Sequence, residues 1–294
     1  MDNRFETNEF QMKIKYLDLV QTADSGQCFR WKKANEDKNG CTYEIPAFGR
    51  VLKIRQQGEN FTFYCSEQEF REIWWNYLDL SGDYEQYLNS VDETDEFLKA
   101  ASRYGSGIRI LRQDPWETAV SFLISQCNNI PRIKGCIEKI CRYFGEDGIC
   151  FPTPERLAAL EGEELSLFRK GCSLGYRDEY ILSLAGRIAK GSFSLEECGE
   201  LPYEECVRKL RTLQGVGPKV ADCIALFGFH KIDAFPIDVH MKQVLYDHYY
   251  SEDLDKLSRT KQLKTMEDRY FSRYSGYRGI IQQWIFAYVI GNET

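Results

Sequence analysis

Short runs of β-branched and aromatic residues dominate the first part of the chain and predict an antiparallel sheet. Three such runs cover residues 42–46, 50–56 and 60–65, and Gly or Asn residues separate them as turns. A further strand is predicted to include residues 27–31, with the sequence Q-C-F-R-W. Residues 67–80 then place aromatic and aliphatic side chains at helical spacing, so we expect a helix directly after the sheet.

From about residue 83 onward, apolar positions recur every three to four residues and predict an all-helical body. Two helices carry continuous apolar stripes, which are Trp116-Ala119-Val120-Leu123-Cys127 and Ile133-Ile137-Ile140-Cys141. Further helices are predicted to begin near residues 152–154 and to cover residues 179–190, 204–213 and 279–290. The pattern therefore predicts an α+β protein, with an antiparallel β domain followed by helices.

A Gly-rich turn with the sequence Q-G-V-G-P-K, residues 214–219, joins two of these helices. Gly215 and Gly217 are expected to permit positive φ and close backbone approach. Pro218 suits the first position of the second helix, where its missing N–H costs nothing. The free N–H groups at this helix start could bind a phosphate oxygen, although a plain turn between two core helices is the alternative.

Two ionisable residues follow the turn. Lys219 lies in the first turn of the second helix, where desolvation and the helix dipole both favour the neutral, nucleophilic amine. Asp238 lies 19 residues further on, within F-P-I-D-V-H, and is also predicted to cap the helix that begins at Val239. An exposed lysine and a purely structural cap are the alternative interpretations.

The composition, 43% hydrophobic and 28% charged over 294 residues, suits a folded protein of one large domain or two to three lobes. No apolar run approaches the roughly 18 residues of a membrane span, and no signal-peptide layout is present. We therefore expect a protein that is not secreted, located in the cytoplasm or nucleoid of a bacterium or in a eukaryotic nucleus. Eleven scattered cysteines and three histidines predict free thiols and no zinc or iron–sulfur site.

The net charge of −7 argues against indiscriminate binding to DNA, but it does not exclude a local basic face. Five basic side chains could gather around one groove, namely Arg132, Lys134, Arg177, Lys219 and Lys242.

Four further motifs accompany the Gly-rich turn. They are S-G-Q-C-F-R-W at residues 25–31, S-F-L-I-S-Q-C-N-N-I-P-R-I at 121–133, L-G-Y-R at 174–177, and the pair Gln282 and Phe286. In this order, the five motifs resemble those of the 8-oxoguanine DNA glycosylase/AP lyase family, in the helix-hairpin-helix DNA glycosylase superfamily. The resemblance implies an N-terminal sheet like that of the TATA-binding protein and a two-lobed helical body.

The resemblance also implies a division into domains. A β-rich domain is expected over residues 1–105, and a helical lobe with base-reading loops over 106–214. A second lobe over 215–294 would carry the hairpin, the catalytic residues and the pocket helix. Residues 106–114 are expected to pack with this last lobe.

Site residues follow from the same resemblance. Lys219 matches the nucleophile that attacks C1′ of a flipped nucleotide, and Asp238 matches the carboxylate that stabilises charge on the sugar. The damaged base would meet four residues: Gly26, whose carbonyl accepts the N7–H of 8-oxoguanine; Cys223 and Phe286, which sandwich the base; and Gln282, which reads its Watson–Crick edge.

Contacts with DNA are also implied. Tyr176 matches a wedge for the gap left by flipping, and Arg132 and Arg177 match readers of the orphaned cytosine. The other implied DNA contacts are Asn128, Asn129, Gly215, Gly217 and His240.

The implied activity is excision of 8-oxoguanine from duplex DNA through a lysine Schiff base, followed by nicking through β-elimination. The implied partner is double-stranded DNA that contains 8-oxoguanine, and a monomer is expected. No catalytic metal or cofactor is implied, although carbonyls of Arg211, Leu213 and Val216 could hold a structural cation. A glycosylase with another base preference and a non-catalytic DNA-binding module are the alternatives, and Lys219 speaks against both.

The chain departs from the family pattern at three positions. Cys127 replaces the first asparagine of the family's N-N-N run, which puts strict dependence on an opposite cytosine in doubt. Gln283 and Trp284 are bulkier than the residues usually found there, and we expect them to change the packing behind the pocket.

Overall fold

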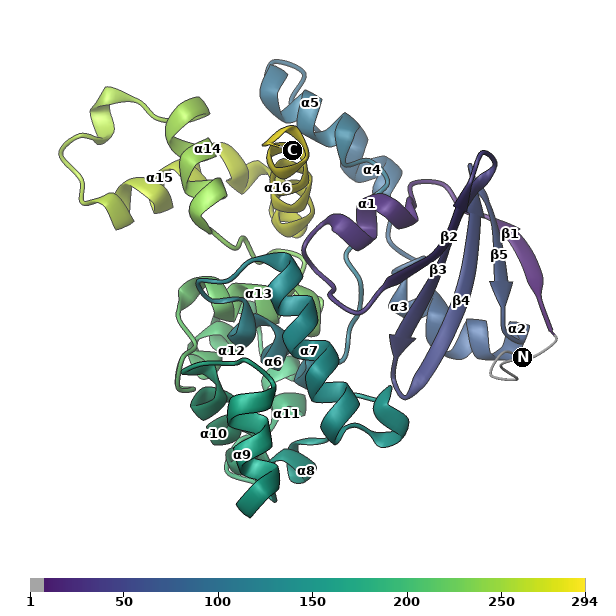
Figure 1. The fold of residues 1–294 in the computed structure, drawn as a ribbon. Helices are drawn as coiled ribbons and strands as arrows, with labels where there is room; N and C mark the ends of the chain where they lie inside the picture. The colour runs from purple at the N-terminus through teal and green to yellow at the C-terminus, as the bar shows by residue number, and fades with distance from the viewer. Residues whose placement is uncertain (1–7, 294) are drawn as a thin grey trace.

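The computed structural model describes residues 8–293, with a five-stranded sheet on one side and helical lobes on the other (Figure 1). The strands are β1 (Phe10–Lys13), β2 (Lys32–Asp37), β3 (Gly40–Ala47), β4 (Arg50–Gln57) and β5 (Asn60–Tyr64). All neighbouring strands pair antiparallel, in the order β1-β5-β4-β3-β2. The antiparallel sheet and the three strands predicted near residues 42–65 are confirmed.

One face of the sheet is covered by the helical segment of residues 67–77. Alternate side chains of β3, β4 and β5 are buried against it: Tyr43, Ile45, Leu52, Ile54, Phe61 and Phe63. The segment comprises α2 (Glu67–Glu69), a π-helical stretch (Phe70–Trp74) and α3 (Trp75–Tyr77), and Phe70 packs on Phe63 with ring centroids 4.4 Å apart. The predicted helix thus exists but ends at Tyr77, because Asp79 has the left-handed φ of 51°.

The strand predicted at residues 27–31 is wrong, because β2 begins only at Lys32. Helix α1 (Leu19–Asp24) precedes this segment, and Gly26 has a φ of 75°. Gln27, Cys28 and Phe29 are consecutive and all buried, so the segment turns its side chains into the molecule instead of alternating across a sheet.

The rest of the described chain is helical, as predicted. Its α-helices are α4 (Tyr84–Asn89), α5 (Glu96–Tyr104), α6 (Pro115–Ser125), α7 (Ile130–Phe144), α8 (Pro154–Ala158), α9 (Gly162–Gly171), α10 (Arg177–Ala189), α11 (Leu195–Glu200), α12 (Tyr203–Leu210), α13 (Pro218–Gly228), α14 (Val239–His248), α15 (Arg259–Phe271) and α16 (Arg278–Glu293). The stripe predicted to continue to Cys127 is wrong at that residue: α6 ends at Ser125, and Cys127 is exposed with a φ of 47°.

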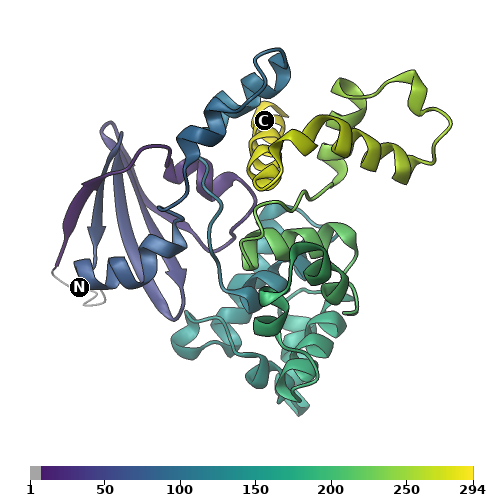
Figure 2. The same cartoon turned by 180° about the vertical axis from the view of Figure 1, so that it is seen from behind.

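Helix α16 occupies the centre of the molecule. Helices α6 to α13 form one lobe, α14 and α15 form another, and α16 lies between these lobes and the sheet domain (Figures 1 and 2). Helices α4 and α5 belong to the helical core, and α5 packs along α16. No helix among residues 8–293 combines the length and apolarity needed to cross a membrane.

The segment of residues 106–114 links the sheet domain to the helical body. Leu111 N donates to Gln27 Oε1 at 2.8 Å, and Arg112 N donates to the Tyr77 carbonyl at 2.9 Å. The segment reaches α13 through Gln113 N, which donates to the Phe227 carbonyl at 3.3 Å. The domain division proposed from the sequence stays a prediction.

Candidate active site

The Gly-rich turn has the predicted helix-hairpin-helix form, between α12 and α13. Gly215 has a φ of 81°, and a Cβ there would lie 2.3 Å from Cδ2 of Tyr180, so only glycine fits. Gly217 is different: its φ of −83° and ψ of 178° are extended, and it is the N-cap residue of α13. The expectation of positive φ is therefore confirmed at Gly215 and wrong at Gly217. Pro218 stands at the start of α13, as predicted.

One face of α13 carries Lys219, Cys223 and Phe227, each four residues after the last, into a single pocket. The Lys219 Nζ lies 5.2 Å from the ring centroid of Phe122, on α6. Burial raises the pKa of the Cys223 thiol to about 11, although the charge of Lys219 acts in the opposite direction. Cys223 is therefore a neutral, largely apolar wall beside the lysine.

Asp238 reaches the same pocket from the start of α14. Its Oδ1 accepts a hydrogen bond from the Met241 N–H at 2.9 Å, so the predicted capping role is confirmed. A side chain held in this way has few rotamers left to sample. The carboxylate is partly exposed and lines the same pocket as the α13 residues.

Helix α16 supplies a further wall. Gln282 is 4% exposed, and its Oε1 is buried without a hydrogen-bond partner in the structure. A buried, unpaired amide oxygen is costly, and such atoms are frequently satisfied by a ligand or water. Phe286 lies one turn further along α16, and a Cβ added at Gly26 would lie 3.0 Å from its Cε1.

We call this cavity the Lys219 pocket. It has a volume of about 310 Å³ including its open mouth. Its lining residues are Ser25, Gly26, Phe122, Lys219, Cys223, Phe227, Pro236, Asp238, Gln282, Gln283 and Phe286. All six residues predicted for catalysis or for contact with the damaged base are among them.

Five lining residues were not predicted as site residues: Ser25, Phe122, Phe227, Pro236 and Gln283. Phe227 could have been found from its spacing, four residues after Cys223 on the same helix face. Phe122 stacks on Phe227, with centroids 5.4 Å apart and planes at 16°. Its place depends on the packing of α6 against α13, which no local pattern reveals.

The two residues predicted to read the opposite strand, Arg132 and Arg177, lie in the first turns of α7 and α10. Arg177 does not face outward in this structure: it is 5% exposed, and its Nε donates to the Gln126 carbonyl at 3.0 Å. Its Nη1 and Nη2 donate to the carbonyls of Leu174 at 3.1 Å and Cys127 at 3.2 Å. Contact with an orphaned base would require Arg177 to leave these carbonyls, and this role stays a prediction.

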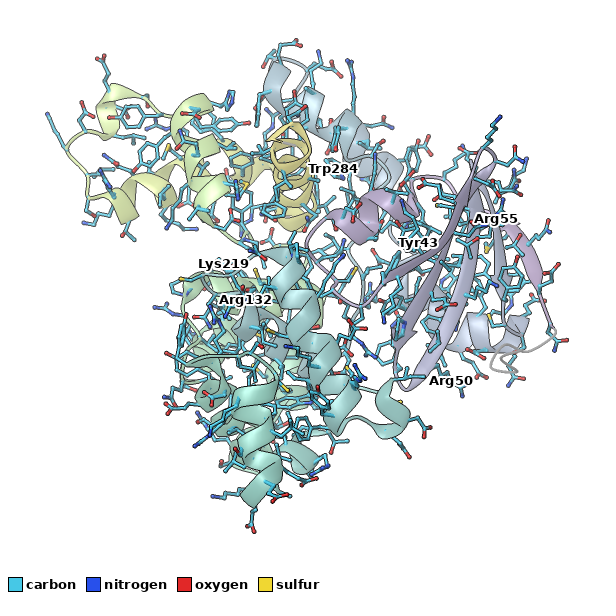
Figure 3. The ribbon with its side chains drawn as sticks, in the orientation of Figure 1. Tyr43, Arg50, Arg55, Arg132, Lys219 and Trp284 are labelled. Carbon is cyan, nitrogen blue, oxygen red and sulfur yellow. The ribbon has the colours of Figure 1, made fainter. Side chains whose placement is uncertain are left out.

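The two predicted asparagines have structural partners. Asn128 Nδ2 donates to the Ile124 carbonyl at 3.1 Å, and Asn129 Oδ1 accepts from the Arg132 N–H at 3.0 Å, which caps α7. Arg132 itself is exposed, and Figure 3 labels it and Lys219 within the lobe formed by α6 to α13.

Tyr176 and His240 are two other predicted DNA contacts. Tyr176 is 52% exposed, and Arg177 lies against its ring at 4.6 Å. His240 lies edge-on to Phe286, with ring centroids 6.1 Å apart. Their contacts with DNA stay predictions, as does a cation at the hairpin, where the Leu213 carbonyl already accepts the Val216 N–H at 3.2 Å.

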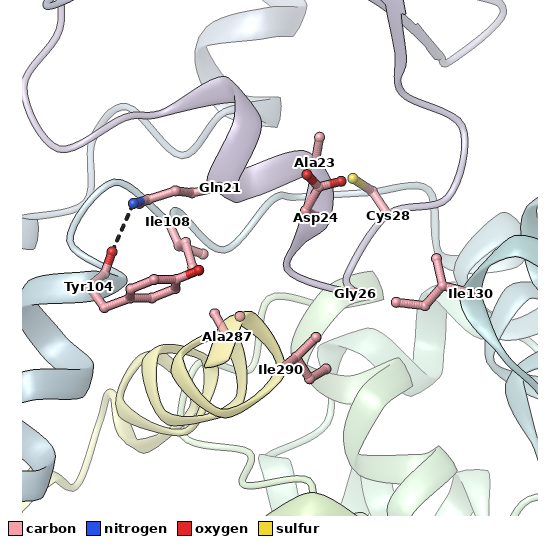
Figure 4. Close-up of a pocket in the computed structure, with 11 residues that line it drawn as sticks. Gln21, Ala23, Asp24, Gly26, Cys28, Tyr104, Ile108, Ile130, Ala287 and Ile290 are labelled. Carbon is pink, nitrogen blue, oxygen red and sulfur yellow. Dashed lines mark hydrogen bonds between the residues drawn. The ribbon is translucent and has the colours of Figure 1, made fainter. Parts of the chain in front are cut away.

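A second cavity is also lined by Gly26 (Figure 4). It lies between α1 and α16, and Asp24, Ile130, Ala287 and Ile290 are among its lining residues. Gly26 therefore borders two cavities, this one and the Lys219 pocket.

Comparison with known proteins identifies the chain. Residues 9–119 match the N-terminal domain of 8-oxoguanine DNA glycosylase, and residues 120–267 match the HhH-GPD superfamily of base excision DNA repair proteins. The N-glycosylase/DNA lyase OGG1 of Arabidopsis thaliana is 30% identical over 94% of this chain and 79% of its own. The chain belongs to the 8-oxoguanine DNA glycosylase family.

Solved structures of the family have the same fold. The 8-oxoguanine glycosylase/lyase of Clostridium acetobutylicum, in complex with double-stranded DNA containing cytosine opposite 8-oxoG, superposes with a TM-score of 0.84. It is 33% identical and covers 99% of this chain and 100% of its own. The 3-methyladenine DNA glycosylase of Archaeoglobus fulgidus, with a TM-score of 0.70 and 18% identity, shares the fold. The family assignment and fold class predicted from the sequence are confirmed.

Proposed function

We propose that this protein excises 8-oxoguanine from duplex DNA and then nicks the abasic strand. One observation carries the proposal: Lys219, Asp238, Gly26 and Gln282, from four separate segments, line one pocket. The two steps require an amine, a carboxylate, a backbone carbonyl and an unpaired amide, and these four residues supply them. Membership of the 8-oxoguanine DNA glycosylase family supports the same activity.

Lys219 is the nucleophile in this proposal. Its amine attacks C1′ of a nucleotide flipped into the pocket, and the bond from C1′ to the base breaks. The ring-opened sugar remains joined to Lys219 as a Schiff base. Loss of a C2′ proton then expels the 3′ phosphate, and water releases the lysine from the cleaved product.

Asp238 stabilises the positive charge that develops on the sugar during base loss. Its capping bond fixes one oxygen, so the carboxylate is oriented before the substrate arrives. The reaction is an exchange of bonds to carbon with proton transfers, and none of its steps needs a metal or a redox cofactor.

Base recognition uses the walls of the pocket. The Gly26 carbonyl accepts the N7–H that guanine lacks and 8-oxoguanine carries, and Cys223 and Phe286 enclose the two faces of the base. The unpaired Oε1 of Gln282 accepts a donor from the Watson–Crick edge. Tyr176 occupies the gap left by the flipped nucleotide, and Arg132 and Arg177 contact the opposite cytosine. The hairpin amides near Gly217 hold a backbone phosphate.

Borohydride trapping tests the proposal. Wild-type protein, Lys219→Gln and a matched control, Lys190→Gln, are each incubated with an 8-oxoguanine:C duplex and with undamaged duplex. Lys190 is exposed at the end of α10 and does not line the pocket. We expect a covalent adduct with damaged DNA for wild type and Lys190→Gln, and none for Lys219→Gln. Free base without an adduct would indicate a water-using relative, and neither product would indicate a DNA-binding module.

A further inference from the structure

Gln283 makes a contact that packing alone does not explain. Its side chain is 1% exposed, and its Nε2 donates to the carbonyl of Ser25 at 2.6 Å. Ser25 directly precedes Gly26, so this bond joins the pocket helix α16 to the loop that carries the Gly26 carbonyl. The expectation that Gln283 changes only the packing behind the pocket is therefore incomplete.

The Gly26 loop has other anchors on both sides of Gly26. On the N-terminal side, the Ser25 hydroxyl donates to the Thr22 carbonyl at 2.8 Å and accepts from Gln27 Nε2 at 2.9 Å, so the bond from Gln283 adds a hold on the Ser25 carbonyl itself. On the C-terminal side, Gln27 Nε2 donates to the Arg109 carbonyl at 2.9 Å, and Gln27 Oε1 accepts from Leu111 N at 2.8 Å. Between Ser25 and Gln27, Gly26 has a φ of 75° and the wide conformational freedom of glycine. The bond from Gln283 holds the N-terminal side of this flexible residue.

Gly26 itself borders two cavities, whereas its neighbours Ser25 and Gln27 are buried. It lines the Lys219 pocket and also the cavity between α1 and α16 that Figure 4 shows. A glycine that borders cavities has fewer packing contacts to fix its peptide, so the hydrogen bonds of its neighbours matter more for the direction of its carbonyl. Hydrogen bonds weaken steeply as their angle departs from linearity, so a rotation of this peptide would matter for any ligand bound by its carbonyl.

We propose that Gln283 is a positioning residue for recognition of the damaged base: it orients the Ser25–Gly26 peptide so that the Gly26 carbonyl meets the N7–H of 8-oxoguanine. This role rests on the function proposed above. Gln282, its neighbour on α16, contacts the opposite edge of the same base. One rigid helix therefore sets the distance between both recognition points, and loss of the Gln283 bond uncouples them.

The test compares two reactions of one protein. Gln283→Met keeps the size and removes the donor. Single-turnover base release from an 8-oxoguanine:C duplex requires recognition of the base, whereas nicking of a preformed abasic site does not. Gln262→Met is the matched control, because Gln262 is also a buried glutamine and donates to the Leu254 carbonyl at 3.0 Å in the lobe of α14 and α15.

We expect Gln283→Met to lower base release about tenfold, the equivalent of about 1.4 kcal/mol, while nicking stays within about twofold of wild type. Gln262→Met should leave both rates near those of wild type. Unchanged base release, or an equal loss of both activities, in Gln283→Met overturns the role. If that variant does not fold, Gln283→Asn, whose shorter side chain cannot reach Ser25, gives the same comparison. A wild-type protein that nicks abasic sites but releases no 8-oxoguanine refutes the proposed function, and this role with it.

Discussion

Replacing Gly26 with alanine should damage recognition of the base more than it damages the fold. Gly26 has a φ of 75°, and the left-handed region costs an L-residue roughly 1–2 kcal/mol. The new Cβ would also lie 3.0 Å from Cε1 and 3.5 Å from Cζ of Phe286. Carbon atoms prefer separations of about 3.5–4.0 Å, so the ring must retreat by about half an ångström, at a cost of roughly 0.5–1.5 kcal/mol.

Gly49→Ala is a matched control for the free-energy cost of placing alanine in the left-handed backbone region. The φ of Gly49 is 71°, nearly that of Gly26, and a Cβ there would meet nothing within 4 Å. Gly49→Ala should therefore lose roughly 1–2 kcal/mol of unfolding free energy through backbone strain alone. Gly26→Ala should lose about 1 kcal/mol more, because it also displaces Phe286. Urea unfolding followed by tryptophan fluorescence measures both values.

Activity separates the two variants more clearly. The displaced ring of Phe286 is the predicted wall of the base site, so Gly26→Ala should slow single-turnover release of 8-oxoguanine at least about tenfold. Gly49→Ala should release the base at the wild-type rate, and both variants should still nick preformed abasic sites. Equal base release by the two variants, or a parallel loss of nicking in Gly26→Ala, would refute the reasoning.

Three further predictions concern the hairpin, the cap and a buried acid. Gly215→Ala places a Cβ 2.3 Å from the Tyr180 ring and should abolish duplex binding in an anisotropy titration, whereas Gly186→Ala, with nothing within 4 Å of its Cβ, should bind normally; equal affinities would contradict this. Asp238→Asn keeps a good cap but loses the charge, so its melting temperature should match wild type while adduct formation falls; Asp238→Ala should also lose about 0.5–2 kcal/mol of stability. Burial raises the pKa of Asp222 to about 7, so its protonated form stabilises the fold at low pH, and that contribution is lost as pH rises toward neutrality. The melting temperature of Asp222→Asn, relative to wild type, should therefore rise between about pH 4 and pH 7, and a constant difference would show that Asp222 does not titrate in this range.

Most elements and several site residues could be predicted from local pattern. The alternation in β3 to β5 and the helical spacing of α7 and α16 depend only on near neighbours in sequence. The failures have specific causes. Residues 27–31 carry aromatic side chains in the alternating pattern of a strand, which predicted a strand there. In the structure these side chains are buried in an irregular loop. Cys127 continued an apolar stripe in sequence after its helix had ended.

The sequence by itself determined the local features that depend only on residues close to one another in the chain. Glycine at position 215, the spacing of Lys219 and Cys223 on one helix face, and the capping role of Asp238 all follow from backbone geometry within a few residues. Only the tertiary structure decided which distant groups meet. Gln283 and Ser25 lie 258 residues apart in sequence, yet they share a hydrogen bond, and Arg177 is buried against carbonyls of another loop. Such contacts depend on how whole elements pack, and no local pattern records that packing.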